Sequence, residues 1–334
     1  MMVATLGDLS QSYSMRQRNV ALREQLAQYS EELATGQVAD VRQVLNGNYS
    51  YLTDIERKMD IIAGYSVATA EATHFTNGMQ LAIGETSELS RDLSATLITA
   101  GTSALGAARS DIAGEARNAL EAIVDRINTN VSGRFLFSGT ATDQPPLPDA
   151  QVLLDAVRTA MAGAATPSDM MAAAQAWFDD PLGFATTVYQ GTDDPLAPFA
   201  LSSTDAVGLD LRATDPDIKR VLMLTAVSAL AQDASFGLDV VQQTELFAIT
   251  GQEMLSARDG VTSLGARIGF VEARIDAVAT QNAAEQTSLS FAKAELLEID
   301  PFEAATRLED VQFNLESLYV ITARNAQLSL VNFI

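Results

Sequence analysis

The stretch VTSLGARIGFVEARIDAV, residues 261–278, decides the expected fold because its apolar residues keep a regular helical spacing. Apolar residues that recur on average about every 3.5 positions form a narrow stripe along a helix, and such a stripe packs against a partner helix. The stretch therefore predicts a long helix that is paired with another helix. The apolar residues, separated alternately by three and four positions, are Val261, Leu264, Ile268, Val271, Ile275 and Val278.

Three further stretches have the same spacing, two in the N-terminal part of the chain and one at its C-terminal end. Each by itself is equally compatible with an ordinary amphipathic helix face in a bundle. Because the stretches lie in both halves, we expect coiled-coil pairing between the two ends, with the first and last stretches as the assembly interface. They are Leu22, Leu26, Tyr29 and Leu33; Leu52, Ile55, Met59 and Ile62; and Leu308, Val311, Leu315 and Leu318.

The prolines divide the chain into helical arms and a central insert. Eight of the nine prolines lie between Pro145 and Pro216, and the ninth is Pro301. Proline costs roughly 3 kcal/mol inside a helix, so the long proline-free stretches predict long helices. Asp300 is a good N-cap and Pro301 suits the first helical position, so a last helix is expected to begin there. Its expected partner is a first helix that ends near Gly36.

The expected fold is mainly α. It is a long antiparallel coiled-coil-like helical bundle built from both termini, with a small α/β insert domain in the middle. Residues 1–35 plus 296–334 would form a terminal helical assembly segment. Residues 36–144 plus 232–295 would form a helical rod domain, and residues 145–231 the insert domain.

Local patterns predict the elements of the insert and of the segment before it. Residues 133–140 are expected to hold a short strand, and Asn46-Gly47-Asn48 a turn. Residues 49–130, if unbroken, would form a rod roughly 120 Å long. Ser168 is the expected N-cap of a short helix. Helices are expected over residues 151–163, 168–179 and 217–231, and β-like runs over 184–190, 198–202 and 207–212.

Composition excludes several classes of function. The 334 residues include 21 Lys and Arg against 43 Asp and Glu, and the net charge of −22 disfavours binding to nucleic acids or anionic membranes. With no cysteine and one histidine, disulfides, thiolate sites and imidazole-rich metal sites are excluded. The mean hydropathy is +0.09, yet the longest apolar run, residues 221–231, is about half of the ~20 residues that a membrane-spanning helix needs. We therefore expect apolar helix faces buried against other helices, including those of other chains.

Familiar catalytic motifs do not occur in the sequence. It has no P-loop and no G-x-G-x-x-G, H-E-x-x-H or G-x-S-x-G pattern. The pair Asp193-Asp194 has the composition of a turn, and Asp210, Asp215 and Asp217 lack the glycine and final glutamate of a calcium loop. We expect no catalytic residue, no metal site and no cofactor, and so not an enzyme. The alternative from another class is an enzyme or a sugar-binding protein with a polar cleft around Asp193, Asp194 and Asp210.

Short motifs at both ends of the chain resemble one known family. The motifs are GRFLFSGT at 133–140 with Thr142-Asp143 and Pro145-Pro146 after it, LATG at 33–36, SLGAR at 263–267, EARI at 272–275, EAATRL at 303–308 and LSLVNFI at 328–334. Together they resemble, over residues 1–144 and 255–334, the flagellar hook–filament junction proteins, which are relatives of flagellin. One departure is VADVR at 38–42, where that family often has an S-x-x-D-D-P-A-like loop.

The resemblance implies a structural subunit of the bacterial flagellum that joins hook to filament. Such a subunit is extracellular and leaves the cell by type III export without a cleaved signal peptide; the first eleven residues indeed have no pattern typical of one. Its terminal helices are disordered in the free monomer and pair on assembly. The implied partners are a second junction protein on the hook side, flagellin on the filament side, further copies in a ring or tube, and an export chaperone. Nucleic acid and membrane are not implied.

Two further alternatives are considered besides the enzyme or sugar-binding protein. Flagellin itself, the filament subunit, is the close one, and self-polymerisation of the purified protein would favour it. A cytoplasmic signalling rod of the chemoreceptor type is disfavoured, because the sequence shows no membrane span and has a large insert.

Overall fold

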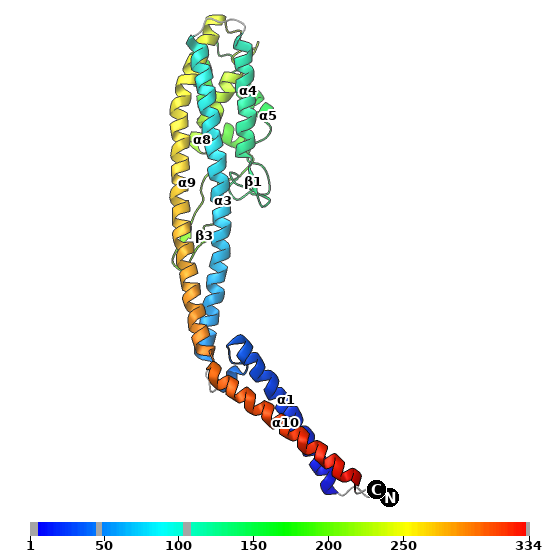
Figure 1. Cartoon of the computed structure of the whole chain (residues 1–334). Coiled ribbons are helices and arrows are strands. Elements are labelled where there is room, and N and C mark those ends of the chain that lie inside the picture. The colour runs from blue at the N-terminus through cyan, green and yellow to red at the C-terminus, as the bar shows by residue number, and fades with distance from the viewer. Residues whose placement is uncertain (1–5, 45–48, 103–107, 332–334) are drawn as a thin grey trace. The chain divides into compact units, whose positions relative to one another are not determined.

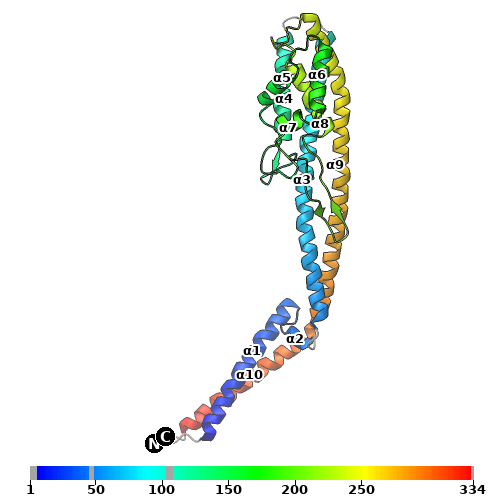
Figure 2. The same ribbon diagram turned by 180° about the vertical axis from the view of Figure 1, so that it is seen from behind.

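A computed structural model describes residues 6–44, 49–102 and 108–331, and Figures 1 and 2 show it from opposite sides. Within these residues the chain is mainly α, as expected, with two small antiparallel sheets. The predicted turn at 46–48 and the last three residues of the motif at 328–334 lie outside the described residues. The elements are α1 (Leu6–Thr35), α2 (Val41–Val44), α3 (Ser50–Thr102), α4 (Ala108–Ile127), β1 (Asn130–Val131), β2 (Arg134–Phe135), α5 (Ala150–Ala160), α6 (Pro167–Asp179), α7 (Phe184–Thr187), β3 (Phe199–Ala200), β4 (Ala206–Val207), α8 (Pro216–Ala229), α9 (Val240–Leu297) and α10 (Pro301–Val331).

The chain divides into two compact units, not into the three expected parts. The terminal unit comprises residues 1–63 and 284–334, and the central unit comprises residues 64–283. Helix α8, from the expected insert, packs against α4, from the expected rod, inside the central unit. Because α8 is apolar on every side, it has to be surrounded by other elements. The residues expected to form the insert and those expected to form the rod therefore share one core.

In the terminal unit, α1 and α10 lie side by side (Figures 1 and 2). Gly36 follows α1 with a φ of +72°, a left-handed conformation that suits glycine. The backbone N–H of Val38 donates to the carbonyl of Leu297 at 3.0 Å, and that of Ile299 donates to the carbonyl of Gly36 at 3.2 Å. Asp300 caps α10, as expected, by accepting from the backbone N–H two residues on at 2.8 Å. These bonds join the end of α1 to the start of α10.

In the central unit, α3 and α9 approach closely because small residues line their contact. A Cβ added to Gly101 would lie 2.7 Å from Cα of Ala248, and one added to Gly251 would lie 2.9 Å from the backbone nitrogen of Ile98. The Oγ of Ser94 donates a hydrogen bond to the carbonyl of Gly251 at 2.9 Å. Larger side chains at these glycines would push the two helices apart.

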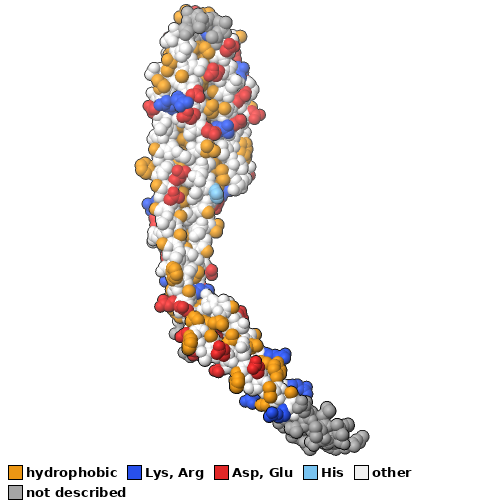
Figure 3. Space-filling model, viewed as in Figure 1, with side chains coloured by type: hydrophobic (Ala, Val, Ile, Leu, Met, Phe, Trp, Pro, Cys, Tyr) orange, Lys and Arg blue, Asp and Glu red, His pale blue; other side chains and the backbone are white. Residues whose placement is uncertain are grey.

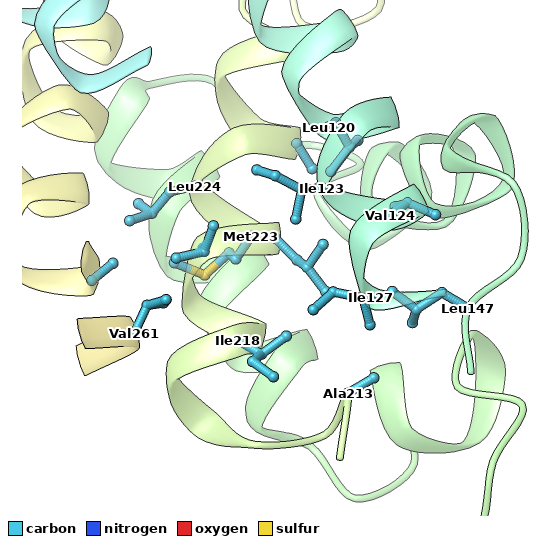
Figure 4. Close-up of a cluster of buried hydrophobic side chains, with 14 of the residues drawn as sticks. Leu120, Ile123, Val124, Ile127, Leu147, Ala213, Ile218, Met223, Leu224 and Val261 are labelled. Atoms are coloured by element: carbon cyan, nitrogen blue, oxygen red, sulfur yellow. The ribbon is translucent and has the colours of Figure 1, made fainter. Parts of the chain in front are cut away.

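Helix α8 is the centre of the core of the central unit. Residues 221–229 are all buried, and Figure 4 shows Met223 and Leu224 of α8 among side chains from α4 and α9. Asp215 caps the helix by accepting from the backbone N–H of Asp217 at 3.1 Å. The longest apolar run of the sequence is therefore a core helix. Within the described ranges, no helix combines the length and apolar character needed to cross a membrane.

The motif at 133–140 forms half of a hairpin and the loop that follows it. Strands β1 and β2 are antiparallel, and Ser132 and Gly133 between them have φ values of 54° and 83°, which fit a type I′ turn. The guanidinium of Arg134 forms an ion pair with Glu71 and lies 4.6 Å from the centre of the Phe75 ring. Arg134 thus fastens the hairpin to α3.

The insert has less strand than the sequence predicted. The β-like run 184–190 is wrong: it begins with the short helix α7, whose Phe184 is buried and stacks on Phe178 with ring centroids 5.0 Å apart. Burial of that aromatic ring, not strand pairing, decides the local conformation. The runs 198–202 and 207–212 shrink to β3 and β4, which pair antiparallel with Phe199 opposite Val207.

Two helix boundaries also differ from the prediction. The N-cap of α6 is Thr166 instead of Ser168, because the Thr166 hydroxyl accepts from the backbone N–H of Asp169 at 3.2 Å and Pro167 takes the first helical position. Residues 49–130 are not one rod, since α3 ends at Thr102 and α4 packs against α8. The apolar face of α4 requires that packing.

Candidate assembly surface of the terminal helices

The predicted apolar run of α10 is buried. Val311, Leu315 and Leu318 are 6%, 9% and 8% exposed, and Leu308 is half-buried. Helix α1 is the element that packs along α10, so these side chains form one side of a helix–helix contact within the chain. Their part in contacts between subunits stays a prediction.

The predicted run of α1 is buried only in part. Leu33 is 40% exposed, whereas its neighbour Glu32 is 5% exposed. The Glu32 carboxylate accepts from Nε2 of Gln28 at 3.0 Å and from the backbone N–H of Ala39 at 3.1 Å. The chain turns back directly after α1 and thereby brings this N–H to Glu32, so a polar residue takes the inner position. The half-buried members of the run are Leu22, Leu26 and Tyr29.

A polar contact joins the two helices of the pair. Nη2 of Arg23 donates to the Tyr319 hydroxyl at 2.9 Å. This bond, together with one from Asn19, holds the pKa of Tyr319 below its usual range. Beside it, Val20 of α1 and Ile321 of α10 line a shallow groove. The polar and apolar contacts together place α1 antiparallel to α10.

Helix α10 has a second apolar face that the sequence analysis missed. Phe302, Phe313 and Val320 are 82%, 70% and 60% exposed. They are separated by eleven and seven positions, which are about three and two helical turns, so they share one face. We call these three residues the outer stripe. Figure 3 shows apolar side chains exposed along this unit. The periodic signal was present in the sequence, but the stronger run through Leu315 concealed it.

Two of the three carboxylates of the alternative polar cleft meet at one arginine, but the three do not line a common groove. Asp193, Asp194 and Asp210 are exposed, and Arg212 reaches Asp210 at 3.2 Å and Asp193 at 3.9 Å. The groove that includes Asp210 is lined mainly by apolar side chains, and neither Asp193 nor Asp194 lines it. Among the residues that the structure describes, no three His, Cys, Asp or Glu side chains are grouped to hold a metal ion. The geometry gives this alternative no support.

Comparisons with known proteins find one family model and similar solved structures. Residues 252–334 match the family model of the bacterial flagellin C-terminal helical region. No curated protein matches the chain. One similar solved structure is that of a Vibrio parahaemolyticus protein, provisionally assigned as a flagellar hook-associated protein. It is 15% identical with a TM-score of 0.49, and the match covers 73% of this chain and 95% of that one. In residues 252–334, which include α10 and most of α9, the chain is similar to bacterial flagellin.

Proposed function

We propose that the protein is a structural subunit of the bacterial flagellum that joins hook to filament. The observation that carries the proposal is the pair of apolar faces on α10. One face packs on α1, and the other, the outer stripe, is exposed. A helix that is apolar on two sides needs a second packing partner. The flagellin-like sequence of residues 252–334 supports a flagellar partner.

In this proposal the side chains of the terminal helices act by packing, not by catalysis. Neighbouring axial proteins cover the outer stripe: further copies in a ring or tube, a second junction protein on the hook side, and flagellin on the filament side. The subunit reaches this place by type III export without a cleaved signal peptide, and an export chaperone is one of its partners. Burial stabilises the contact by about 25 cal/mol per Å² of apolar surface.

The motif GRFLFSGT at 133–140 favours the junction protein over flagellin. The hairpin that contains this motif is fastened to α3 through Arg134 and Glu71 and belongs to the central unit. Because the motif favours the junction protein, flagellin is the second candidate, and the family match alone supports it. Self-polymerisation of the purified protein into long filaments would favour flagellin, whereas a junction protein forms no long filaments by itself.

The test compares two charged substitutions in α10 with a matched control. Leu315→Asp places a carboxylate in the contact with α1, and Phe313→Asp places one in the outer stripe. The variants are expressed in cells that lack the native protein, and flagella are isolated. We expect Leu315→Asp to abolish incorporation and Phe313→Asp to lower it about tenfold or more, because burying an unpaired charge is costly.

The control is Leu182→Asp, an exposed apolar position in the central unit, which should incorporate normally. Circular dichroism and Trp177 fluorescence of each purified variant check that the central unit is folded. Normal incorporation of both α10 variants would show that the terminal helices are not the assembly surface.

A further inference from the structure

Exposed arginines gather in one part of the terminal unit. Arg16, Arg18 and Arg23 lie on α1 and Arg324 lies on α10, and all four are exposed. None of them takes part in the ion pairs found among the described residues. We call them the basic patch, and Figure 3 shows Lys and Arg side chains concentrated in this region. Such a concentration is notable in a chain with a net charge of −22.

The same helix pair carries a complementary group of carboxylates. Glu31 of α1 and Glu309 and Asp310 of α10 are exposed and form no ion pair within the described part of the chain. We call them the acidic patch. The bond between Arg23 and Tyr319 shows which residues of the two antiparallel helices lie opposite each other. In this register, the α1 and α10 residues of each patch lie at the same level along the helix pair.

The two patches of one chain are too far apart to neutralise each other. About fourteen residues separate their centres along α1, which is roughly 21 Å at 1.5 Å per residue. Oppositely charged atoms form an ion pair within about 4 Å, and salt screens exposed charges beyond about 8 Å. Glu24, an exposed carboxylate of α1, lines the same groove as Arg16 and Arg18 but forms no ion pair with them in the described part of the chain. Most charges of each patch are therefore left without an opposite partner, which a second molecule is able to supply.

We propose that the basic patch of one copy docks on the acidic patch of a second copy, with the two helix pairs side by side and offset by roughly 20 Å. This inference rests on the proposed function as an assembly subunit and names the surface through which copies recognise each other. Because two different patches meet, each copy keeps one patch free for the next, as a ring or tube requires. The groove lined by Val20 and Ile321 lies beside the basic patch and adds apolar contact area.

A second copy fits the basic patch better than other polyanions do. The strongly negative chain is repelled by nucleic acids and by anionic lipid surfaces. The same repulsion acts between copies, so contact between opposite patches is the arrangement that offsets it locally. Glu309 and Asp310 lie on α10, and Arg16 and Arg18 lie on α1. The charges that would meet between two copies are therefore all carried by helices.

The test is a charge exchange in the full-length protein. One variant carries Arg16→Glu with Arg18→Glu, and the other carries Glu309→Arg with Asp310→Arg. Self-association is measured by sedimentation equilibrium in about 50 mM and about 500 mM NaCl. We expect each variant alone to associate about tenfold more weakly than the native protein at low salt. A mixture of the two variants should regain the native strength, since opposite charges face each other again.

The matched control is Arg117→Glu, which reverses an exposed arginine of the central unit that has no ion pair among the described residues. It should associate like the native protein. Circular dichroism confirms that each variant keeps its helices. High salt should weaken the native association and leave the variants little changed.

Three results would overturn the inference: native association that does not respond to salt, a mixture that fails to restore it, or arginine-dependent binding to phosphatidylglycerol vesicles with no association between copies. The outcome is separable from that for Phe313→Asp. If the arginine variants associate normally while Phe313→Asp fails to incorporate, the patch contact is wrong and the proposed function stands.

Discussion

The central unit and the terminal unit solve the burial of apolar side chains differently. In the central unit, α8 is covered on all sides by other elements of the chain, and residues 221–229 are buried. In the terminal unit, α10 buries one face on α1 and leaves Phe302 and Phe313 exposed. Two helices side by side bury the apolar residues between them and leave their outer faces uncovered. The central unit is therefore complete by itself, whereas the terminal unit has room for partners.

The largest expected effect is on the free energy of unfolding of the central unit, which should respond to a core substitution in that unit and not to one in the terminal unit. Ile123 on α4 is fully buried in the central core (Figure 4), whereas Leu315 lies in the α1–α10 contact. Ile123→Ala should lower the free energy of unfolding of the central unit by about 3 kcal/mol, because it leaves a cavity. Leu315→Ala should leave that unit unchanged. Trp177, the single tryptophan, lies in the central unit, so its fluorescence during urea unfolding reports on that unit alone. An equal shift of the Trp177 transition by both variants would contradict the separation.

A smaller effect is expected from a glycine that only the central unit requires. Gly139 has a φ of +63°, and a Cβ added there would lie 2.3 Å from the carbonyl oxygen of Thr192. Gly139→Ala should therefore destabilise the central unit by about 2 kcal/mol. Gly163→Ala is the matched control, since Gly163 also has a positive φ but open space around it. It should cost about 1 kcal/mol. Equal losses in the Trp177 transition would show that the contact with Thr192 does not matter.

The smallest effect concerns acid stability of the central unit. The hydroxyl of Ser235, its backbone N–H and the guanidinium of Arg158 lower the pKa of Asp233 to about 2. A carboxyl with a lowered pKa in the folded state stabilises the fold above its unfolded pKa of about 4, and this contribution is lost as the pH falls through 2. Asp233→Asn should therefore cost about 1 kcal/mol at neutral pH and progressively less below pH 4.

Urea unfolding of the native protein and this variant, followed by Trp177 fluorescence between about pH 7 and pH 2, checks the expectation. A difference in unfolding free energy that stays constant over this range would show that the Asp233 charge does not stabilise the central unit.

The sequence by itself determined the helical character of the chain and several of its boundaries. The spacing through Leu315 and Val311, the cap at Asp300 and the turn at Gly36 are local signals, because they depend on residues within one or two helical turns. The same holds for the cap at Asp215 before α8. Periodicity also identified Val311, Leu315 and Leu318 as one face of α10, and these three side chains are buried. A regular stripe specifies a helix face whatever its partner is.

Only the tertiary structure decided which faces meet and what remains uncovered. Glu32 replaces Leu33 at the inner position because the chain turns back and offers it the N–H of Ala39. Residues 184–187 are helical because the ring of Phe184 is buried against Phe178. The outer stripe of α10 is exposed because no other described part of the terminal unit covers it. In the first two cases the deciding neighbour is close in sequence but lies beyond the end of a helix, and in the third case a covering contact is missing. The spacing of apolar residues within one helix carries no information about either.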